Sequence, residues 1–210
     1  MNHTITNYDP FGNASTGKLG MWLFLVMDAL TFATILSGGL YLRLRTDLWP
    51  NAGEILNIPL TSFNTFLLII SSFTMVLALN SARSKDIDNL KLFLSLTILG
   101  GVTFLGIQVY EYGHFIVGGP ALENALLQAG FSGHSSLTWN TGVYGSTFYA
   151  TTSFHGLHVL TGVIYLSVIL FNVSKGVGLE AYYDRIEIAG LFWHFVDLVW
   201  ILVFTIIYLI

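Results

Sequence analysis

The sequence predicts an all-α integral membrane protein, a bundle of five transmembrane helices. Of its 210 residues, 54% are hydrophobic and only 10% are charged, whereas soluble domains carry about 25% charged residues. The mean hydropathy is +0.69. The apolar residues also gather into five segments, each long enough to cross a bilayer. The predicted spans are residues 19–41, 60–79, 90–109, 143–171 and 188–210.

We expect two parts: a polar N-terminal segment, residues 1–18, and a five-helix membrane domain, residues 19–210. Residues 1–17 contain no lysine or arginine, so they lack the charged start of a signal peptide. We therefore expect the first apolar segment to remain as a membrane helix. The five segments are too long and unbroken to be strands of a membrane β-barrel, which need only about 9–11 residues each.

Lysine and arginine are distributed unequally between the two ends of this predicted bundle. One end carries Lys18, Arg83, Lys85, Lys91, Lys175 and Arg185. The other end carries only Arg43 and Arg45, and the third loop there, residues 110–138, has no basic residue. Because basic residues favour the cytoplasmic side of a membrane, we expect a cytoplasmic N-terminus and an outer C-terminus.

Several function classes are disfavoured by composition alone. The sequence has no cysteine, which excludes disulfides, thiolate zinc sites and iron–sulfur ligation. No basic patch is present that could bind nucleic acid. Paired glycines, Gly38-Gly39 and Gly100-Gly101, are expected to let neighbouring helices approach closely.

Ionisable residues within the predicted spans are the strongest functional signal. His155 and His158 lie three residues apart in the fourth span, so they are expected on one helix face. Asp28 and Asp197 both lie nine residues into a span, roughly 13 Å from the cytoplasmic surface. His194 lies one turn nearer that surface. A polar cluster of Asp28, His155, His158, His194 and Asp197 is therefore predicted in the interior of the membrane domain. Glu111 and His114 stand apart, at the outer end of the third span.

Metal binding is the first interpretation of these residues, and the spacing disfavours it. Diiron bundles use Glu-x-x-His pairs, but the residue three before His155 is Thr152. Haem ligation uses histidines of separate helices, which two histidines on one face fit poorly. A proton-conducting network is the second interpretation, because buried Asp and His mark such paths in membranes. The third is that these groups only hydrogen-bond between helices and fix their packing. The residues leave the last two open; no catalytic residue and no metal ligand is expected.

Five stretches, in this order and spacing, resemble subunit III of the haem–copper terminal oxidases along nearly the whole chain. They are Gly20–Asp28 (GMWLFLVMD), Asn64–Leu68 (NTFLL), Gly106–His114 (GIQVYEYGH), Phe154–Val159 (FHGLHV) and Trp193–Trp200 (WHFVDLVW). The mitochondrial form of this family has seven helices, and this chain resembles the last five, as in many bacterial forms.

The resemblance implies a subunit without a redox centre in a proton-pumping respiratory oxidase that reduces oxygen to water. Haem and copper are then expected in subunits I and II. The partners implied are these two subunits and membrane phospholipid, and could extend to a small subunit IV and a respiratory supercomplex. The implied location is the bacterial inner membrane. Asp28 takes the place of a family glutamate that is part of a proton-collecting, oxidase-stabilising network beside subunit I.

The electron donor implied by the resemblance is cytochrome c, because the chain reads Phe-His-Gly-x-His at Phe154–His158 and Gln-x-Tyr-Glu-Tyr at Gln108–Tyr112. A quinol oxidase, or a relative associated with nitric oxide reductase, is the alternative within the family. From another class, a stand-alone proton-coupled transporter is possible. Such a transporter would be expected to show internal repeats and broken helices, and neither is evident in the sequence.

Overall fold

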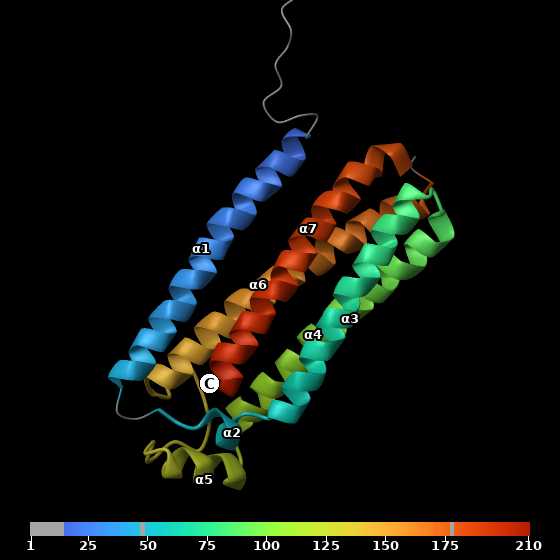
Figure 1. Ribbon diagram of the computed structural model, residues 1–210. Coiled ribbons are helices and arrows are strands. Elements are labelled where there is room, and N and C mark those ends of the chain that lie inside the picture. Colours follow the sequence, from blue (N-terminus) through green and yellow to red (C-terminus); the bar gives the residue numbers. More distant parts are fainter. Residues whose placement is uncertain (1–14, 47–48, 177–178) are drawn as a thin grey trace, which may run out of the picture.

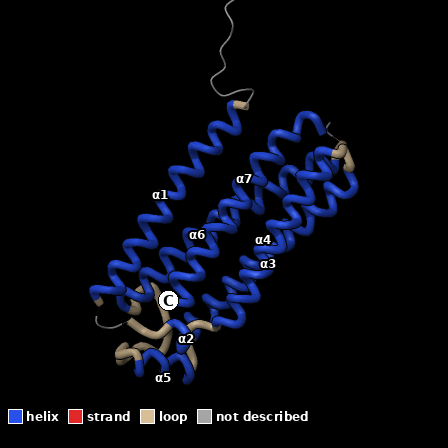
Figure 2. Tube along the Cα trace, viewed as in Figure 1, coloured by secondary structure: helices blue, strands red, loops and turns tan. Residues whose placement is uncertain are grey.

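The computed structural model describes residues 15–46, 49–176 and 179–210. Residues 1–14, most of the predicted N-terminal segment, therefore lie outside the described part of the chain. Within the described ranges the regular structure is helical, with no strand (Figure 2).

Five long helices run side by side in an elongated bundle (Figure 1). They are α1 (Thr16–Arg45), α3 (Ile58–Arg83), α4 (Ile87–Val117), α6 (Gly142–Ser174) and α7 (Leu179–Phe204). α7 continues as a π-helical turn, η1 (Thr205–Leu209). All five helices are long and apolar enough to cross a membrane. The predicted fold class, an all-α bundle of five membrane helices, is confirmed.

Helix α7 lies at the centre of the bundle, where it packs against α1, α3 and α6. Helix α4 packs on α3 and α6, and α1 lies at one edge against α7 and α6. An ion pair fastens α1 to α7 near the start of both helices, where Lys18 Nζ lies 2.7 Å from Glu187 Oε2 and 3.6 Å from Asp184 Oδ1. The edge helix α1 is therefore held by α6, α7 and this ion pair.

Polar side chains start three of the long helices. Ser15 Oγ accepts the Lys18 backbone N–H at the start of α1, Asn57 Oδ1 accepts that of Leu60 in α3, and Asp86 Oδ1 accepts that of Asn89 in α4. These caps satisfy backbone donors that have no partner inside the helix. Between α3 and α4, Lys85 takes a positive φ of 57°, which closes a tight turn and places the two helices antiparallel.

The helices extend beyond the ranges expected from hydropathy. α4 continues to Val117, eight residues past the predicted residue 109, and α7 begins at Leu179, nine residues before residue 188. Hydropathy locates the apolar core of a span, whereas backbone hydrogen bonding continues into the polar interface.

Two short helices at the end of the bundle where α1 ends and α3 begins were not expected from the sequence (Figure 1): α2 (Ala52–Ile55) and α5 (Pro120–Gln128). Helix α5 lies within residues 110–138, which we expected to be a loop; that expectation is wrong. Pro120 occupies the first turn of α5, Glu123 lies close to its positive end, and Leu122, Ala125 and Leu126 are buried beneath it. A nine-residue helix of this kind is stabilised by its packing rather than by its own propensity.

Small residues let the helices approach closely, as expected at Gly39, Gly100 and Gly101. A Cβ atom added at Gly101 would lie 2.5 Å from Trp193 Cη2, and one at Gly100 would lie 2.6 Å from Ser71 Cβ. At Gly39 it would lie 2.9 Å from Thr147 Cγ2, whereas at Gly38 it would meet nothing within 4 Å. Close helix contact therefore requires glycine at three of these four positions.

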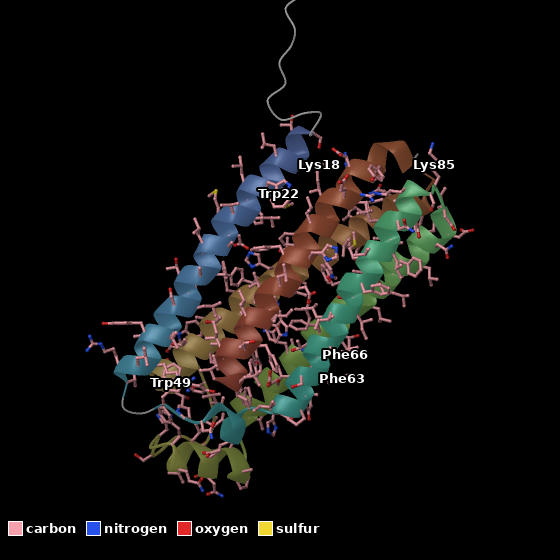
Figure 3. The ribbon with its side chains drawn as sticks, viewed as in Figure 1. Lys18, Trp22, Trp49, Phe63, Phe66 and Lys85 are labelled. Carbon is pink, nitrogen blue, oxygen red and sulfur yellow. The ribbon has the colours of Figure 1, made fainter. Side chains whose placement is uncertain are left out.

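Large apolar side chains cover the outside of the bundle, as expected where the surroundings are lipid. Trp22, Phe63 and Phe66 are 56%, 55% and 59% exposed, and Figure 3 shows them on α1 and α3. The buried side chains, by contrast, include polar and ionisable groups. Among these are Asp28, Glu111, His155 and Asp197.

Candidate functional site: polar groups inside the membrane bundle

Asp28 of α1 and His158 of α6 form a pair between the edge helix and the bundle. His158 Nε2 lies 3.3 Å from Asp28 Oδ2, and the two side chains are only 15% and 8% exposed. The rings of Phe32 and Phe154 pack against the His158 ring at centroid distances of 5.2 and 4.7 Å. The two ionisable side chains thus meet in an apolar, aromatic site.

The other nitrogen of His158 fixes how many protons this pair holds. His158 Nδ1 lies 2.8 Å from the Phe154 carbonyl oxygen, which can only accept, so we assign the hydrogen of this bond to Nδ1. Nε2 then faces Asp28 Oδ2 in an ion-pair contact of 3.3 Å, and Oδ2 has no hydrogen-bond partner among the described residues. With one proton on the pair, either a carboxylic acid faces a neutral imidazole or a carboxylate faces an imidazolium. Both arrangements are neutral overall, which is what a low-dielectric site favours.

A second polar group joins α3 to α7. Ser72 Oγ lies 2.6 Å from His194 Nδ1. Asp197, three residues further along α7, lies on the same side of that helix as His194. Asp197 is 7% exposed, and its Oδ1 atom is buried without a hydrogen-bond partner.

His155 is buried alone in the centre of the bundle. It is fully inaccessible, and both of its ring nitrogens lack a hydrogen-bond partner among the described residues. Its ring lies 4.8 Å from that of Trp200, 5.7 Å from Phe104 and 6.3 Å from Phe32, measured between centroids. Its surroundings are those of a core aromatic residue.

Glu111 lies in the last two turns of α4, apart from the other groups. Thr61 Oγ1 lies 3.2 Å from Glu111 Oε1, and the Tyr208 hydroxyl donates to Oε2 at 3.1 Å. The π-helical turn η1 carries Tyr208 and so brings this hydroxyl to the carboxyl group. Glu111 and His114 both line a cavity of about 220 Å³, together with Asn57 and Tyr110.

The five residues predicted as one interior cluster are therefore arranged in three places. Asp28 pairs with His158, and His194 bonds to Ser72 with Asp197 one turn further along α7, while His155 lies among aromatic rings. Within the described part of the chain, no group of three or more His, Asp or Glu side chains is arranged to hold a metal ion.

Comparison with known proteins decides the family. The family model described as cytochrome c oxidase subunit III matches residues 121–210. The chain is 31% identical to cytochrome c oxidase subunit 3 of Bacillus sp. (strain PS3) over 91% of this chain and 84% of that protein. The chain belongs to the cytochrome c oxidase subunit III family. The resemblance inferred from the five sequence stretches is confirmed.

The subunit III family includes proteins named for two electron donors. The chain is 33% identical to cytochrome c oxidase subunit 3 of Bacillus subtilis (strain 168) over 91% of this chain and 84% of that protein. It is also 30% identical to quinol oxidase subunit 3 of the same organism, over 93% of this chain and 89% of that protein. These similarities are too close to each other to separate the two kinds of oxidase.

Sequence reasoning missed the residues that connect the polar groups of this subunit III. Ser72, Thr61 and Tyr208 each supply a hydroxyl to an ionisable group on another helix. Hydroxyl residues are frequent in membrane helices, and most of those here bond to a carbonyl one turn earlier, as Thr65 does with Thr61. The rotation of each helix about its axis decides which hydroxyls reach another helix and which bond to their own backbone. The sequence carries no local signal for that rotation.

Proposed function

We propose that this chain is the non-redox subunit III of a proton-pumping respiratory cytochrome c oxidase that reduces oxygen to water. The family assignment supports this role, since relatives with 31% and 33% identity are named cytochrome c oxidase subunit 3. The haems and copper of such an oxidase would then be held by subunits I and II. This chain would be a non-catalytic partner of both, with the outer Glu111 and His114 outside the catalytic path.

In this proposal the chain stabilises subunit I and supports its proton uptake. The single observation that carries the proton role is the Asp28–His158 pair, 3.3 Å apart in an aromatic site inside the membrane bundle. Ionisable groups at this depth are energetically costly, and for that reason they usually mark a functional site. A pair that holds one proton is neutral, and it can release that proton to become a single anion or accept a second one to become a single cation.

Bound phospholipid is part of the same proposal. A crevice between α1, α6 and η1 is lined by apolar residues, among them Leu36, Phe148 and Ile207. Arg43 and Trp49 line the crevice as well. This combination suits an acyl chain with an anionic headgroup, because arginine binds phosphate and tryptophan favours the membrane interface.

We further propose a multi-pass location in the bacterial inner membrane, with residues 1–18 cytoplasmic, residues 19–210 as the membrane domain and the C-terminus outside. In Figure 3 Lys18 and Lys85 lie near one end of the bundle and Trp49 near the other. The end with Lys18 and Lys85 also carries Arg83, Lys91, Lys175 and Arg185, which supports a cytoplasmic position for it.

A quinol oxidase is the second candidate, and the 30% identity to quinol oxidase subunit 3 of Bacillus subtilis favours it nearly as well. Purification by a tag on this chain would test both. We expect co-purification with haem-containing partners and oxygen consumption driven by reduced cytochrome c. Oxygen consumption driven by a quinol alone would favour the second candidate. A tagged chain that migrates without haem, under conditions that keep other oxidases intact, would contradict an oxidase subunit of either kind.

A further inference from the structure

The carboxyl group of Glu111 is hydrogen-bonded to two other elements, α3 and the C-terminal turn η1. Tyr208 of η1 donates its hydroxyl hydrogen to Glu111 Oε2 at 3.1 Å, and Thr61 Oγ1 of α3 lies 3.2 Å from Glu111 Oε1. Thr61 Oγ1 also lies 3.1 Å from the Asn57 carbonyl oxygen, one turn earlier in the chain. Glu111 and Tyr208 are only 5% and 2% exposed. One buried carboxyl group therefore connects the C-terminal turn to α3 and α4.

The number of hydrogens in these contacts indicates the protonation state of Glu111. The Asn57 carbonyl oxygen can only accept, so the Thr61 hydroxyl donates its single hydrogen there. Thr61 Oγ1 then accepts in its contact with Glu111 Oε1, and we assign the hydrogen of that bond to the carboxyl group. A carboxylate would compete with the Asn57 carbonyl for the one Thr61 hydrogen. All three contacts are satisfied together when Glu111 is a neutral carboxylic acid.

No positive charge is in place to hold a carboxylate at this position. Among the described residues, the Glu111 carboxyl group bonds to the hydroxyls of Thr61 and Tyr208 and to no lysine, arginine or histidine. A buried charge without a partner is costly, and a carboxyl group in such a place keeps its proton. Burial therefore favours the same neutral form as the hydrogen-bond arrangement.

The other titratable or charged groups on the surrounding elements do not form an ion pair with Glu111 in the described part of the chain. They are Tyr144 and Tyr149 on α6, Glu54 on α2, Glu123 on α5, His114 on α4 and Arg83 at the far end of α3. Glutamate, histidine and tyrosine ordinarily do not change charge between about pH 7 and pH 9. A titration of this region within that range is therefore expected to come from a carboxyl group that is buried, as Glu111 is.

A cavity beside Glu111 offers its carboxyl group a second position. The cavity has a volume of about 220 Å³, and Glu111 and His114 of α4 line it together with Asn57 and Leu60. A cavity of this size has room for several water molecules. A carboxylate that turns into it can be hydrated, which removes most of the cost of its charge.

From this geometry we propose that Glu111 is a proton-binding site that controls the C-terminal turn. As an acid, Glu111 holds Tyr208 of η1 against α3 and α4. When Glu111 gives its proton to water, the carboxylate turns into the cavity and Tyr208 loses its partner. A buried hydroxyl without a partner is unfavourable, so η1 loosens. No bond between heavy atoms changes. This contact is present in acid and is lost as the pH rises, and it is independent of the proposed role in proton uptake.

Two substitutions separate the proton from the contact that it controls. Glu111→Gln stays neutral at every pH, and its amide can donate to Thr61 Oγ1 while its carbonyl accepts from Tyr208. Tyr208→Phe removes the contact at every pH. Tyr110→Phe is the matched control, because Tyr110 is adjacent to Glu111 and lines the same cavity but is 68% exposed.

The test measures hydrogen–deuterium exchange of the backbone amides of residues 205–210 in the intact, purified complex between about pH 7 and pH 9. Each rate is divided by that of Glu111→Gln at the same pH, which removes the ordinary pH dependence of amide exchange. We expect this ratio to rise about fivefold or more in the wild type, the factor that corresponds to loss of one hydrogen bond. Tyr110→Phe should show the same rise. Tyr208→Phe should exchange faster than Glu111→Gln by a factor that does not change with pH.

A wild-type ratio that stays constant or falls with pH would overturn the proposal, because the carboxylate would then still hold Tyr208. An equal rise in Tyr208→Phe would overturn it as well, since the effect would not pass through the Tyr208 hydroxyl. If Glu111→Gln does not assemble, the wild type is compared with Tyr208→Phe instead. Their exchange rates should then converge as the pH rises, and a constant difference between them would contradict the proposal.

Discussion

His158 Nε2 lies 3.3 Å from Asp28 Oδ2, and this contact joins the edge helix α1 to α6 within the membrane bundle. The Phe154 carbonyl occupies His158 Nδ1, so the pair is neutral when it holds one further proton. The same contact therefore has two consequences, one for the attachment of α1 and one for proton handling. Substitutions at its two residues separate them.

Asp28→Asn should preserve the attachment of α1 while removing the titratable carboxyl group, because the asparagine amide can donate to the bare Nε2 of His158. If Asp28 helps to collect protons, oxygen consumption should fall most at alkaline pH, where protons are scarce. We expect a decrease on the order of tenfold there, less than the about 100-fold or more contributed by a proton-transfer group at a reacting centre. This decrease is measured as oxygen consumption of the purified complex as a function of pH. An unchanged pH profile with normal assembly would show that the pair only packs α1.

His158→Ala should weaken the attachment of α1 in addition to removing the titratable imidazole. It leaves the buried Asp28 carboxyl group without its partner, which costs about 1–3 kcal/mol. The yield of complex that retains this chain after detergent extraction measures the effect. Wild-type yield would indicate that the Lys18–Glu187 ion pair and apolar packing suffice to hold α1.

The position of each ionisable residue along its helix could be read from the sequence, but its partners on other helices could not. Counting residues from each span end gave the five predicted ionisable residues similar depths. The rotation of each helix decides which way a side chain points, and hydropathy does not fix it because every face of these helices is apolar. His155 and His158 illustrate this: three residues correspond to about 300° of rotation, so the two side chains lie only about 60° apart. Even so, His155 packs in the aromatic core, whereas His158 reaches Asp28 on α1.

Family resemblance was readable for a different reason. The five stretches that carry it are short, continuous in sequence and independent of helix rotation. Helix α5 could not be predicted in the same way. Its nine residues become helical only when Leu122 and Leu126 are buried against other parts of the chain. Contacts between distant residues determine such elements.

Gly101→Ala should destabilise the bundle. Its new Cβ would lie 2.5 Å from Trp193 Cη2 and 2.6 Å from Val163 Cγ2, and overpacking of this kind costs about 1–3 kcal/mol. Gly106→Ala on the same helix is the control, because a Cβ there meets nothing within 4 Å. That change should be neutral or stabilise by up to about 1 kcal/mol, since alanine is the better helix former. Thermal unfolding of the purified complex compares them, and equal midpoints would contradict the close approach of α4 to α7.

Asp86 should make the start of α4 sensitive to acid. The backbone N–H of Asn89 donates to Asp86 Oδ1 at 3.1 Å and its side-chain amide donates to Oδ2 at 2.6 Å. These bonds hold the pKa of Asp86 below its ordinary value. A lowered pKa in the folded state means that the carboxylate stabilises the helix above the unfolded pKa. That contribution is lost as pH falls through the folded pKa.

Amide exchange at Ile87–Leu90, relative to Asp86→Asn at the same pH, measures this contribution of Asp86. Asparagine still caps the helix but carries no charge. We expect slower exchange in the wild type near neutral pH and a ratio that approaches one in acid. A ratio independent of pH would rule out a role for the charge. Asp86→Ala, which cannot cap, should exchange faster than either at neutral pH.

Loss of the whole chain should shorten the working life of the oxidase rather than abolish its chemistry. Because haem and copper are proposed to lie in other subunits, electron transfer itself should not require this chain. It is proposed to cover the membrane-facing side of subunit I and to keep proton delivery fast. An oxidase without it should begin turnover at an appreciable rate and then lose activity sooner than the complete complex, above all at alkaline pH. Slow proton supply would leave reactive oxygen intermediates waiting at the active centre. Oxygen consumption followed over time, with and without the chain, measures this. Complete inactivity from the first turnover would indicate a catalytic role, and equal lifetimes would indicate an assembly partner without influence on proton supply.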